Sequence, residues 1–424
     1  MTDATFGFHG QGRTEVTAPS ELTSVDDYLD FILARVLRPA PIELSTAESL
    51  GLTLAEDIIA EDPVPSFANS AMDGYALVAG DVIAASGTDP IGLRVTGEVA
   101  AGAAELPVVR SGVAVRIMTG APVPPGADAI VPVELTTEEE GVVWVHKHAR
   151  VGDHIRPVGN DVQPGQRLLG AGRRLGPADI GLLAAVGAVR VLVHPSPRVV
   201  VMSTGDELVG LGVVPRPGQI RDANGPMLAA LVRQAGGVPF LSGAVPDDRR
   251  AMMEAIDANL GHADLFVLTG GVSAGTRDHV RDVLAALGEV HPFKVAMKPG
   301  MPQVFGIVEG VPVLALPGNP VSAFVSFEVF VRPVLRHLQG RRDRGRPVVR
   351  AVLAGELRSP AHKRSYARVK LRREEKRWIA TPTSGQGSHQ LTGLVVADGL
   401  AEIPAHITQV DQGDPVLVHL LVDL

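Results

Sequence analysis

The chain has 424 residues, of which 45% are hydrophobic, and this length predicts about three domains with several buried cores. It contains no cysteine, which excludes disulfides, thiolate metal sites, iron–sulfur clusters and cysteine nucleophiles, so any sulfur in its chemistry must arrive on a ligand. Its 39 basic and 47 acidic residues give a net charge of −8, which argues against nucleic acid or an anionic membrane as a general partner.

The N-terminal residues 1–20 are polar and glycine-bearing, and they lack the apolar stretch of a signal peptide. We therefore expect a disordered leader and a cytoplasmic protein. The most apolar stretch, residues 311–331, is interrupted by Pro317, Pro320 and Glu328, so no membrane span is expected.

The next sections differ in their periodicity. Residues 21–50 and 147–188 are helical or mixed, and an amphipathic pattern predicts a helix over residues 25–37 with Ser24 as its N-cap. Between them, residues 51–146 contain short alternating runs punctuated by Gly, Pro and Asp, which predict an all-β module.

Residues 189–340 alternate between apolar runs and helical segments, which is typical of an open α/β sheet. The expected parallel strands are residues 198–202, 265–268 and 313–315, and the expected helices include residues 224–235 and 247–260. We expect Asp247 to cap the second of these helices. After the basic linker 340–347, residues 341–424 are β-rich, with the clearest strands at 366–371 and 415–420.

Three loops of small and hydroxyl-bearing residues follow the three expected strands. Their sequences are STGDEL (203–208), TGGVSAG (269–275) and LPGNPVS (316–322). Ligands bind beyond the carboxyl ends of such strands, and glycines let backbone amides approach phosphate closely, so the loops predict an anion pocket. The alternative for the Pro-Gly-Asn-Pro loop is that it is only a tight turn. The candidate binding residues are Gly205, Gly270, Gly271, Ser273, Pro317, Gly318, Asn319, Pro320 and Ser322.

Lysine is rare in this chain, with 6 lysines against 33 arginines. Two of them, Lys294 and Lys298, are four residues apart in a segment that could be one strand, where they would share a face. Because arginine is the usual cation here, this pair predicts compact donors for phosphate or another oxyanion. The alternative is two solvated surface lysines.

Two carboxylates, Glu207 and Asp278, follow two of the anion loops, where their charge would repel a phosphate. Mg²⁺ resolves this conflict because it binds one or two carboxylates together with substrate phosphates. The alternative is that each acid caps a turn or a helix. The histidines show no zinc-binding spacing, and no Walker-type phosphate loop is present.

Three further motifs are SAMDGYA (70–76), RIMTGAP (116–122) and KVAMKPG (294–300). Together with the three loops, they resemble the molybdopterin molybdenumtransferase family, which includes the C-terminal domain of gephyrin. The resemblance extends from about Ser24 to the C-terminus. It implies a multidomain α/β plus β protein, with a central open α/β molybdopterin-binding domain, an inserted all-β module and a C-terminal β-barrel-like domain.

The resemblance also implies a reaction. Molybdenum from molybdate is inserted into adenylylated molybdopterin, and Mg²⁺-dependent release of AMP gives the molybdenum cofactor. The positions that the family uses functionally are Asp73, Thr119, Asp161, Glu207, Asp247, Asp278, Lys294, Lys298, Pro317 and Pro320, and Ser388 matches a C-terminal loop near the pocket. The resemblance implies catalytic roles for Glu207, Asp278, Asp73 and Thr119. It implies metal binding by Glu207, Asp278 and Asp161. The alternative is that three of these residues are ordinary turn residues without a functional role, namely Asp73, Thr119 and Ser388.

In the family, Asp73 and Thr119 face the pocket of a second subunit, so the resemblance implies a homodimer. Possible further partners are molybdopterin adenylyltransferase and recipient molybdoenzymes. At Met301 the family often has another lysine, so we expect anion binding to be weaker there or to be borrowed from an arginine. Two other functions stay open, a non-catalytic molybdopterin-binding scaffold and a molybdopterin adenylyltransferase.

Overall fold

The computed structural model describes residues 22–272 and 279–422, and contacts divide the chain into two units. Unit 1 contains residues 22–42, 51–55 and 192–422, and unit 2 contains residues 43–50 and 56–191. The finer division into five sections stays a prediction. No helix in the described ranges is both long enough and apolar enough to cross a bilayer.

Unit 2 is built on a six-stranded sheet with the order β8-β5-β7-β6-β10-β9, as the alternating runs predict. Alternate residues of β5 (Gly74–Leu77) are buried on opposite faces, with Tyr75 and Leu77 in one core and Ala76 in another. The other elements here are η1 (Ala47–Ser49), β3 (Ile58–Ile59), β4 (Asn69–Ser70), η2 (Ala79–Val82), β6 (Ile91–Val99), β7 (Val113–Ile117), β8 (Ala129–Pro132), η3 (Val133–Leu135), β9 (Thr136–Glu139), β10 (Val142–Val145), β11 (Ile155–Arg156), β12 (Arg167–Leu169) and α2 (Pro177–Ala185).

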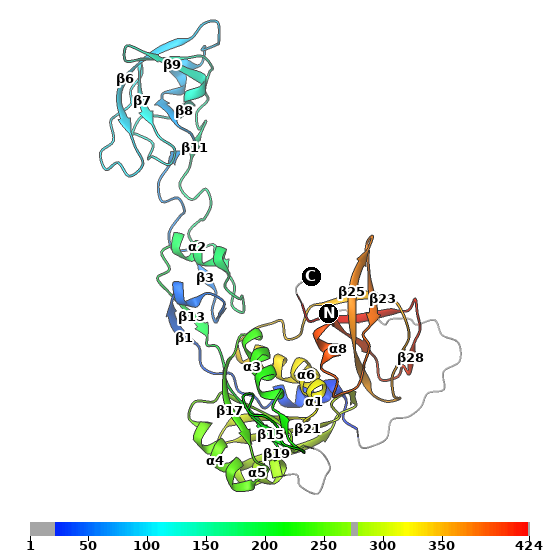
Figure 1. Cartoon of the computed structure of the whole chain (residues 1–424). Coiled ribbons are helices and arrows are strands. Elements are labelled where there is room, and N and C mark those ends of the chain that lie inside the picture. Colours follow the sequence, from blue (N-terminus) through cyan, green and yellow to red (C-terminus); the bar gives the residue numbers. More distant parts are fainter. Residues whose placement is uncertain (1–21, 273–278, 423–424) are drawn as a thin grey trace. The chain divides into compact units, whose positions relative to one another are not determined.

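Unit 1 contains the predicted open α/β sheet, which has the order β17-β14-β18-β22-β21-β19. Figure 1 labels β17, β21 and β19 of this sheet. The three predicted strands are confirmed as β14 (Arg198–Thr204), β18 (Leu265–Thr269) and β22 (Val311–Leu316), and they pair in parallel. β17 (Val238–Val245) extends the parallel part, whereas β21 (Pro302–Val308) and β19 (Gly288–Lys294) add an antiparallel edge.

Helices cover both faces of this sheet because alternate strand residues are apolar on both sides. Val199 and Val201 belong to a core with helices α1 (Val25–Leu33), α3 (Asn224–Gln234), α6 (Pro320–Ser326) and α7 (Arg332–Leu338). Val200 and Met202 belong to a second core with α4 (Arg249–Leu260) and α5 (His279–Leu287). A π-helix, η4 (Phe327–Val331), joins α6 to α7.

Two helix ends test the predicted caps. Ser24 does cap α1, since its hydroxyl accepts a hydrogen bond from the backbone N–H of Asp27 at 3.0 Å, but the helix ends at Leu33 rather than at residue 37. The prediction that Asp247 caps α4 is wrong. The cap is Asp248, whose side chain accepts a hydrogen bond from the N–H of Ala251 at 2.9 Å.

The C-terminal part of unit 1 is a closed five-stranded barrel, which confirms the predicted β-barrel-like domain. The sheet runs β20-β25-β26-β23-β29-β27, and an additional pairing of β25 with β27 closes it. The elements of this part are β20 (Met297–Lys298), β23 (Val348–Leu353), β24 (Leu357–Arg358), β25 (Arg364–Glu374), β26 (Arg377–Pro382), α8 (Thr392–Val395), β27 (Gly399–Ile403), β28 (Gln409–Val410) and β29 (Pro415–Leu420). Unit 1 also contains β15 (Leu208–Val209) and β16 (Ile220–Arg221), and the unit borders lie at β1 (Ile42–Ser45), β2 (Thr53–Leu54) and β13 (Arg190–His194).

A buried ion cluster fastens the basic linker to the α/β domain. The Glu328 carboxylate accepts two hydrogen bonds from Arg332, at 2.6 and 2.9 Å, and two from Arg346, at 2.9 and 3.0 Å. Burial opposes ionisation of Glu328, but the hydrogen bonds from Arg346 and Arg332 outweigh it and hold the pKa of the carboxyl below its usual value. The linker is therefore held to η4, and not free.

We expect Arg346→Met to lower the free energy of unfolding by about 1.5–3 kcal/mol, because Glu328 loses charged hydrogen bonds while it stays buried. Urea unfolding followed by circular dichroism measures this change. Arg250→Met is the control, since Arg250 forms an exposed i,i+4 pair with Glu254. Equal effects of the two substitutions would contradict a stabilising role for the buried cluster.

Candidate active site

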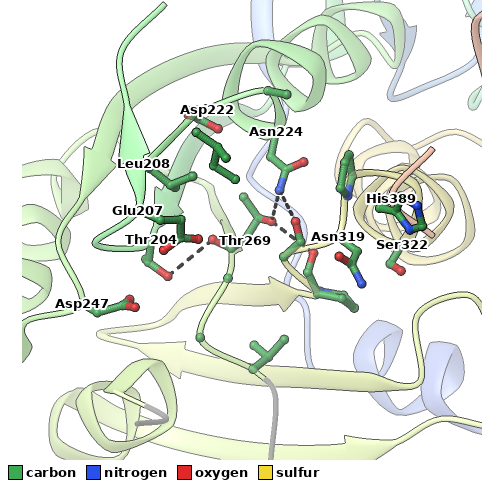
Figure 2. A pocket seen from close by; sticks show the side chains of 18 of the residues that line it. Thr204, Glu207, Leu208, Asp222, Asn224, Asp247, Thr269, Asn319, Ser322 and His389 are labelled. Atoms are coloured by element: carbon green, nitrogen blue, oxygen red, sulfur yellow. Dashed lines mark hydrogen bonds between the residues drawn. The ribbon is translucent and has the colours of Figure 1, made fainter. Parts of the chain in front are cut away.

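A cavity of about 650 Å³ lies beyond the carboxyl ends of β14, β18 and β22. We call it the loop cavity, because all three predicted anion loops line it (Figure 2). Two of these loops approach each other closely, since a Cβ added to Gly318 would lie 3.5 Å from the Cα of Gly270. The predicted site residues that line the cavity are Glu207, Asp247, Gly270, Gly271, Pro317, Gly318, Asn319, Pro320 and Ser322.

Hydrogen bonds hold two of the loops together through Asn224, a residue that the sequence analysis missed. Its amide nitrogen donates to the Thr269 hydroxyl at 3.0 Å and to the Gly318 carbonyl at 2.7 Å (Figure 2). The Thr269 hydroxyl donates in turn to the Pro317 carbonyl at 3.2 Å. A polar side chain at the start of α3, after a strand-like run, is the signal that could have identified Asn224.

The carboxylates that line the loop cavity belong to Glu207, Asp222 and Asp247. Glu207 lies over Gly205, where an added Cβ would be 2.6 Å from a carboxylate oxygen of Glu207, so the glycine lets this acid approach its own loop closely. Asp247 lines the cavity and does not cap α4, and its backbone N–H donates to Asp206 at 3.0 Å. Figure 2 shows Glu207 and Asp247 on one side of the cavity, near Thr204.

Two candidates, Ser273 and Asp278, lie outside the described residues. Asp161 is exposed and belongs to unit 2. Within the described part of the chain, no group of three or more His, Asp or Glu side chains is arranged to hold a metal ion. The described acids of the loop cavity therefore form no all-protein metal cage, and Mg²⁺ commonly completes its shell with water and substrate phosphate.

A second cavity of about 630 Å³ lies between the α/β domain and the barrel. We call it the lysine cavity, because Lys298 lines it together with Ser365, Ser388 and, from the first cavity, Gly300 and Ser322. Gly300 and Ser322 therefore form a wall between the two cavities. A ligand with two anionic groups could occupy both.

The prediction that Lys294 and Lys298 lie on one strand is wrong. Lys294 ends β19 in the α/β sheet, whereas Lys298 belongs to β20, which pairs with β25 of the barrel. Residues 295 and 296 separate the two strands, so strand periodicity does not relate the side chains. Lys298 lines the lysine cavity, whereas Lys294 lines neither of the two cavities described here.

The loop that contains Ser388 is held by a buried arginine that the sequence analysis also missed. Arg368 is 1% exposed and donates to the carbonyls of Gly385 at 2.6 Å and Gly387 at 3.1 Å. This places the Ser388 hydroxyl 3.2 Å from the amide nitrogen of Asn319, which donates to it. The barrel and an anion loop are thus joined at the wall between the cavities.

Met301 contacts a lysine, since the Lys363 ammonium lies 3.4 Å from the Met301 sulfur. The expectation that anion binding is weaker here, or is borrowed from an arginine, stays a prediction.

Unit 2 brings Asp73 and Thr119 together. Asp73 precedes β5 and Thr119 follows β7, and these strands pair antiparallel, with Gly74 opposite Ile117. One Asp73 oxygen accepts hydrogen bonds from the backbone N–H of Thr119 at 2.7 Å and from its hydroxyl at 2.8 Å. These hydrogen bonds, the backbone one first, lower the pKa of the Asp73 carboxyl.

Comparisons with known proteins agree along the whole chain. Family models match in order: the MoeA N-terminal region at residues 23–187, the probable molybdopterin binding domain at 200–337 and the MoeA C-terminal region at 350–421. Molybdopterin molybdenumtransferase 2 of Mycobacterium tuberculosis is 42% identical over 90% of this chain and 95% of the relative. Molybdopterin molybdenumtransferase 1 of that species is 38% identical over 94% and 99%.

A solved structure gives the same result for the fold. The molybdopterin biosynthesis MoeA protein from Pyrococcus horikoshii aligns with a TM-score of 0.83 and 32% identity, over 95% of this chain and all of that one. Full-length similarity to the curated relatives, together with the three family models, shows that the chain belongs to the MoeA family of molybdopterin molybdenumtransferases.

Proposed function

We propose that the chain inserts molybdenum from molybdate into adenylylated molybdopterin and releases AMP and molybdenum cofactor. The observation that supports this most is the pair of neighbouring cavities, one lined by anion loops and the other by Lys298, which share Gly300 and Ser322. An adenylylated pterin has a pyrophosphate and a dithiolene. The pyrophosphate suits the loop cavity, and molybdate suits the cavity that contains the ammonium.

In this proposal the residues of the loop cavity bind and orient the pyrophosphate. Backbone amides of Gly271 and Gly318 approach its oxygens, and Asn224 keeps two loops in register. Glu207 would hold Mg²⁺ with Asp278, or place the water that attacks the pyrophosphate bond. Bound Mg²⁺ neutralises phosphate charge and lowers the barrier to cleavage. The carboxylates of the loop cavity are oxygen donors of the kind that fit this cation.

We further propose a cytoplasmic homodimer with composite sites, in which Asp73 and Thr119 of one subunit complete the loop cavity of the other. Their hydrogen-bonded pairing supports a joint role, because Asp73 is held ionised and in one orientation. Delivery of adenylylated molybdopterin by an adenylyltransferase, and transfer of product to recipient molybdoenzymes, complete the proposed sequence.

One assay separates this function from its two alternatives. Purified protein is mixed with adenylylated molybdopterin, molybdate and Mg²⁺, and both AMP and active cofactor are measured. Molybdate-dependent formation of both products is the expected result. Binding without turnover would indicate a scaffold, whereas formation of adenylylated molybdopterin from ATP and molybdopterin would indicate an adenylyltransferase.

We expect Lys298→Ala to weaken molybdate binding by about 1.5–3 kcal/mol, because one charged hydrogen bond to the oxyanion is lost. Lys298→Arg should restore only part of the affinity, since a planar fork does not reproduce a point charge. Isothermal titration with molybdate measures both variants. Wild-type affinity in the alanine variant would contradict a role for Lys298 in the oxyanion site.

A further inference from the structure

Half of the six lysines of this chain, Lys294, Lys298 and Lys363, are located at or beside the turn formed by residues 294–302. The pairing of β20 with β25 causes this clustering. It sets Met297 opposite Arg364 and Lys298 opposite Ser365, so Lys363 directly precedes the paired strand. In a chain with 33 arginines, such a cluster indicates that ammonium groups are needed at this turn.

Lys363 has an unusual partner for a cation. Its ammonium lies 3.4 Å from the Met301 sulfur, and a thioether is only a weak acceptor. Among the described residues, no carboxylate lies within ion-pair distance of Lys363. The neighbouring Arg364, in contrast, pairs with both Asp26 and Glu402. The half-buried Lys363 ammonium is therefore not neutralised, and an anion beside it would be stabilised.

The lysine cavity is lined by chain neighbours of both partners in this contact. Gly300, which directly precedes Met301, lines that cavity, and so does Ser365, two residues after Lys363. Lys363 itself directly precedes β25, which begins at Arg364. The flexible four-carbon stem of a lysine can move its ammonium from the Met301 sulfur to the mouth of the cavity.

We propose that Lys363 is a second ammonium of the oxyanion site and that it captures tetrahedral molybdate together with Lys298. The inference rests on the proposed function, since that function supplies the oxyanion. In the absence of an anion, the Lys363 ammonium contacts the neutral Met301 sulfur. An anion can therefore attract the ammonium away from Met301 without breaking an ion pair. The expected consequence is a lower KM for molybdate, with turnover at saturating molybdate unaffected.

The test uses the full-length protein and exchanges the charge between two neighbouring positions. Lys363→Met removes the ammonium and nearly keeps the shape, and we expect it to raise both the KM and the Kd for molybdate about tenfold. Adding Met301→Lys to that variant returns an ammonium to the same place, and it should restore most of the affinity. Lys370→Met, which removes an exposed lysine of β25, is the matched control and should leave both constants unchanged.

The outcomes separate the two proposals. Wild-type affinity in Lys363→Met, or a loss that Met301→Lys does not restore in a folded protein, would overturn the role of Lys363 and leave the proposed function intact. A changed kcat at saturating molybdate would also overturn it, because capture alone affects KM. If the wild-type protein releases no AMP with molybdate, the proposed function itself is wrong, and the role of Lys363 is wrong with it.

Discussion

Glu207→Gln is expected to lower the rate of AMP release about a hundredfold or more while the protein stays folded. The amide keeps the shape of the side chain but removes the charge that would hold Mg²⁺ or orient the attacking water. The position of Glu207 in the loop cavity, directly over Gly205, supports this expectation. Chromatographic measurement of AMP under single-turnover conditions gives the rate of the chemical step.

Two further variants serve as controls for Glu207→Gln. Glu254→Gln removes an exposed carboxylate on α4 and should release AMP at the wild-type rate. Asp247→Asn removes another carboxylate of the loop cavity, so its rate shows whether Asp247 acts together with Glu207. Near-normal turnover of Glu207→Gln would indicate that this acid only fills space in its loop.

Asp73→Ala is expected to abolish activity in the homodimer. A second chain that has an intact Asp73 but a substituted loop cavity should restore part of the activity. A mixed dimer of Asp73→Ala and Glu207→Gln subunits should regain up to about half the activity, because one of its two sites then contains neither substitution. The loss in the homodimer would follow from the hydrogen bonds between Asp73 and Thr119, which the alanine cannot accept.

The mixed dimer is obtained by co-expressing the two chains with different tags and purifying through both. A dimer of wild-type and Glu207→Gln subunits is the control and should keep about half the activity. If this control is active while the doubly substituted dimer is as inactive as its parents, Asp73 and Glu207 serve the same site within one chain. The composite site would then be wrong.

The sequence predicted the centre of the α/β sheet better than its edges. β14, β18 and β22 are buried on both faces, so they appear as continuous apolar runs. β17 and β19 are edge strands with many exposed residues, and no such run marks them. The position of Asp247 was misjudged for a local reason, since either of two consecutive aspartates could cap the helix and only the backbone decides between them.

The site was predictable where a loop follows a buried strand, because strand direction brings such loops to one edge. Asn224 and Arg368 were not predictable in this way. Their hydrogen-bond partners are loops 45 to 94 residues away for Asn224 and 17 to 19 residues away for Arg368. Their roles depend on tertiary structure and not on a local pattern. The separation of Lys294 from Lys298 also depends on tertiary structure. Lys294 pairs within the α/β sheet, whereas Lys298 pairs with β25 of the barrel.

The pairing of β20 with β25 also limits how this protein can be dissected. By sequence Lys298 belongs to the α/β domain, but its backbone is hydrogen-bonded to the barrel. A fragment limited to residues 189–340 would keep the phosphate loops and lose the strand that fixes this lysine. Chimaeras that exchange barrels between relatives would thus alter an oxyanion site without changing any residue of the α/β domain. On the proposed function, exchanging the barrel alone would change the affinity for molybdate while the three loops of the loop cavity stayed the same.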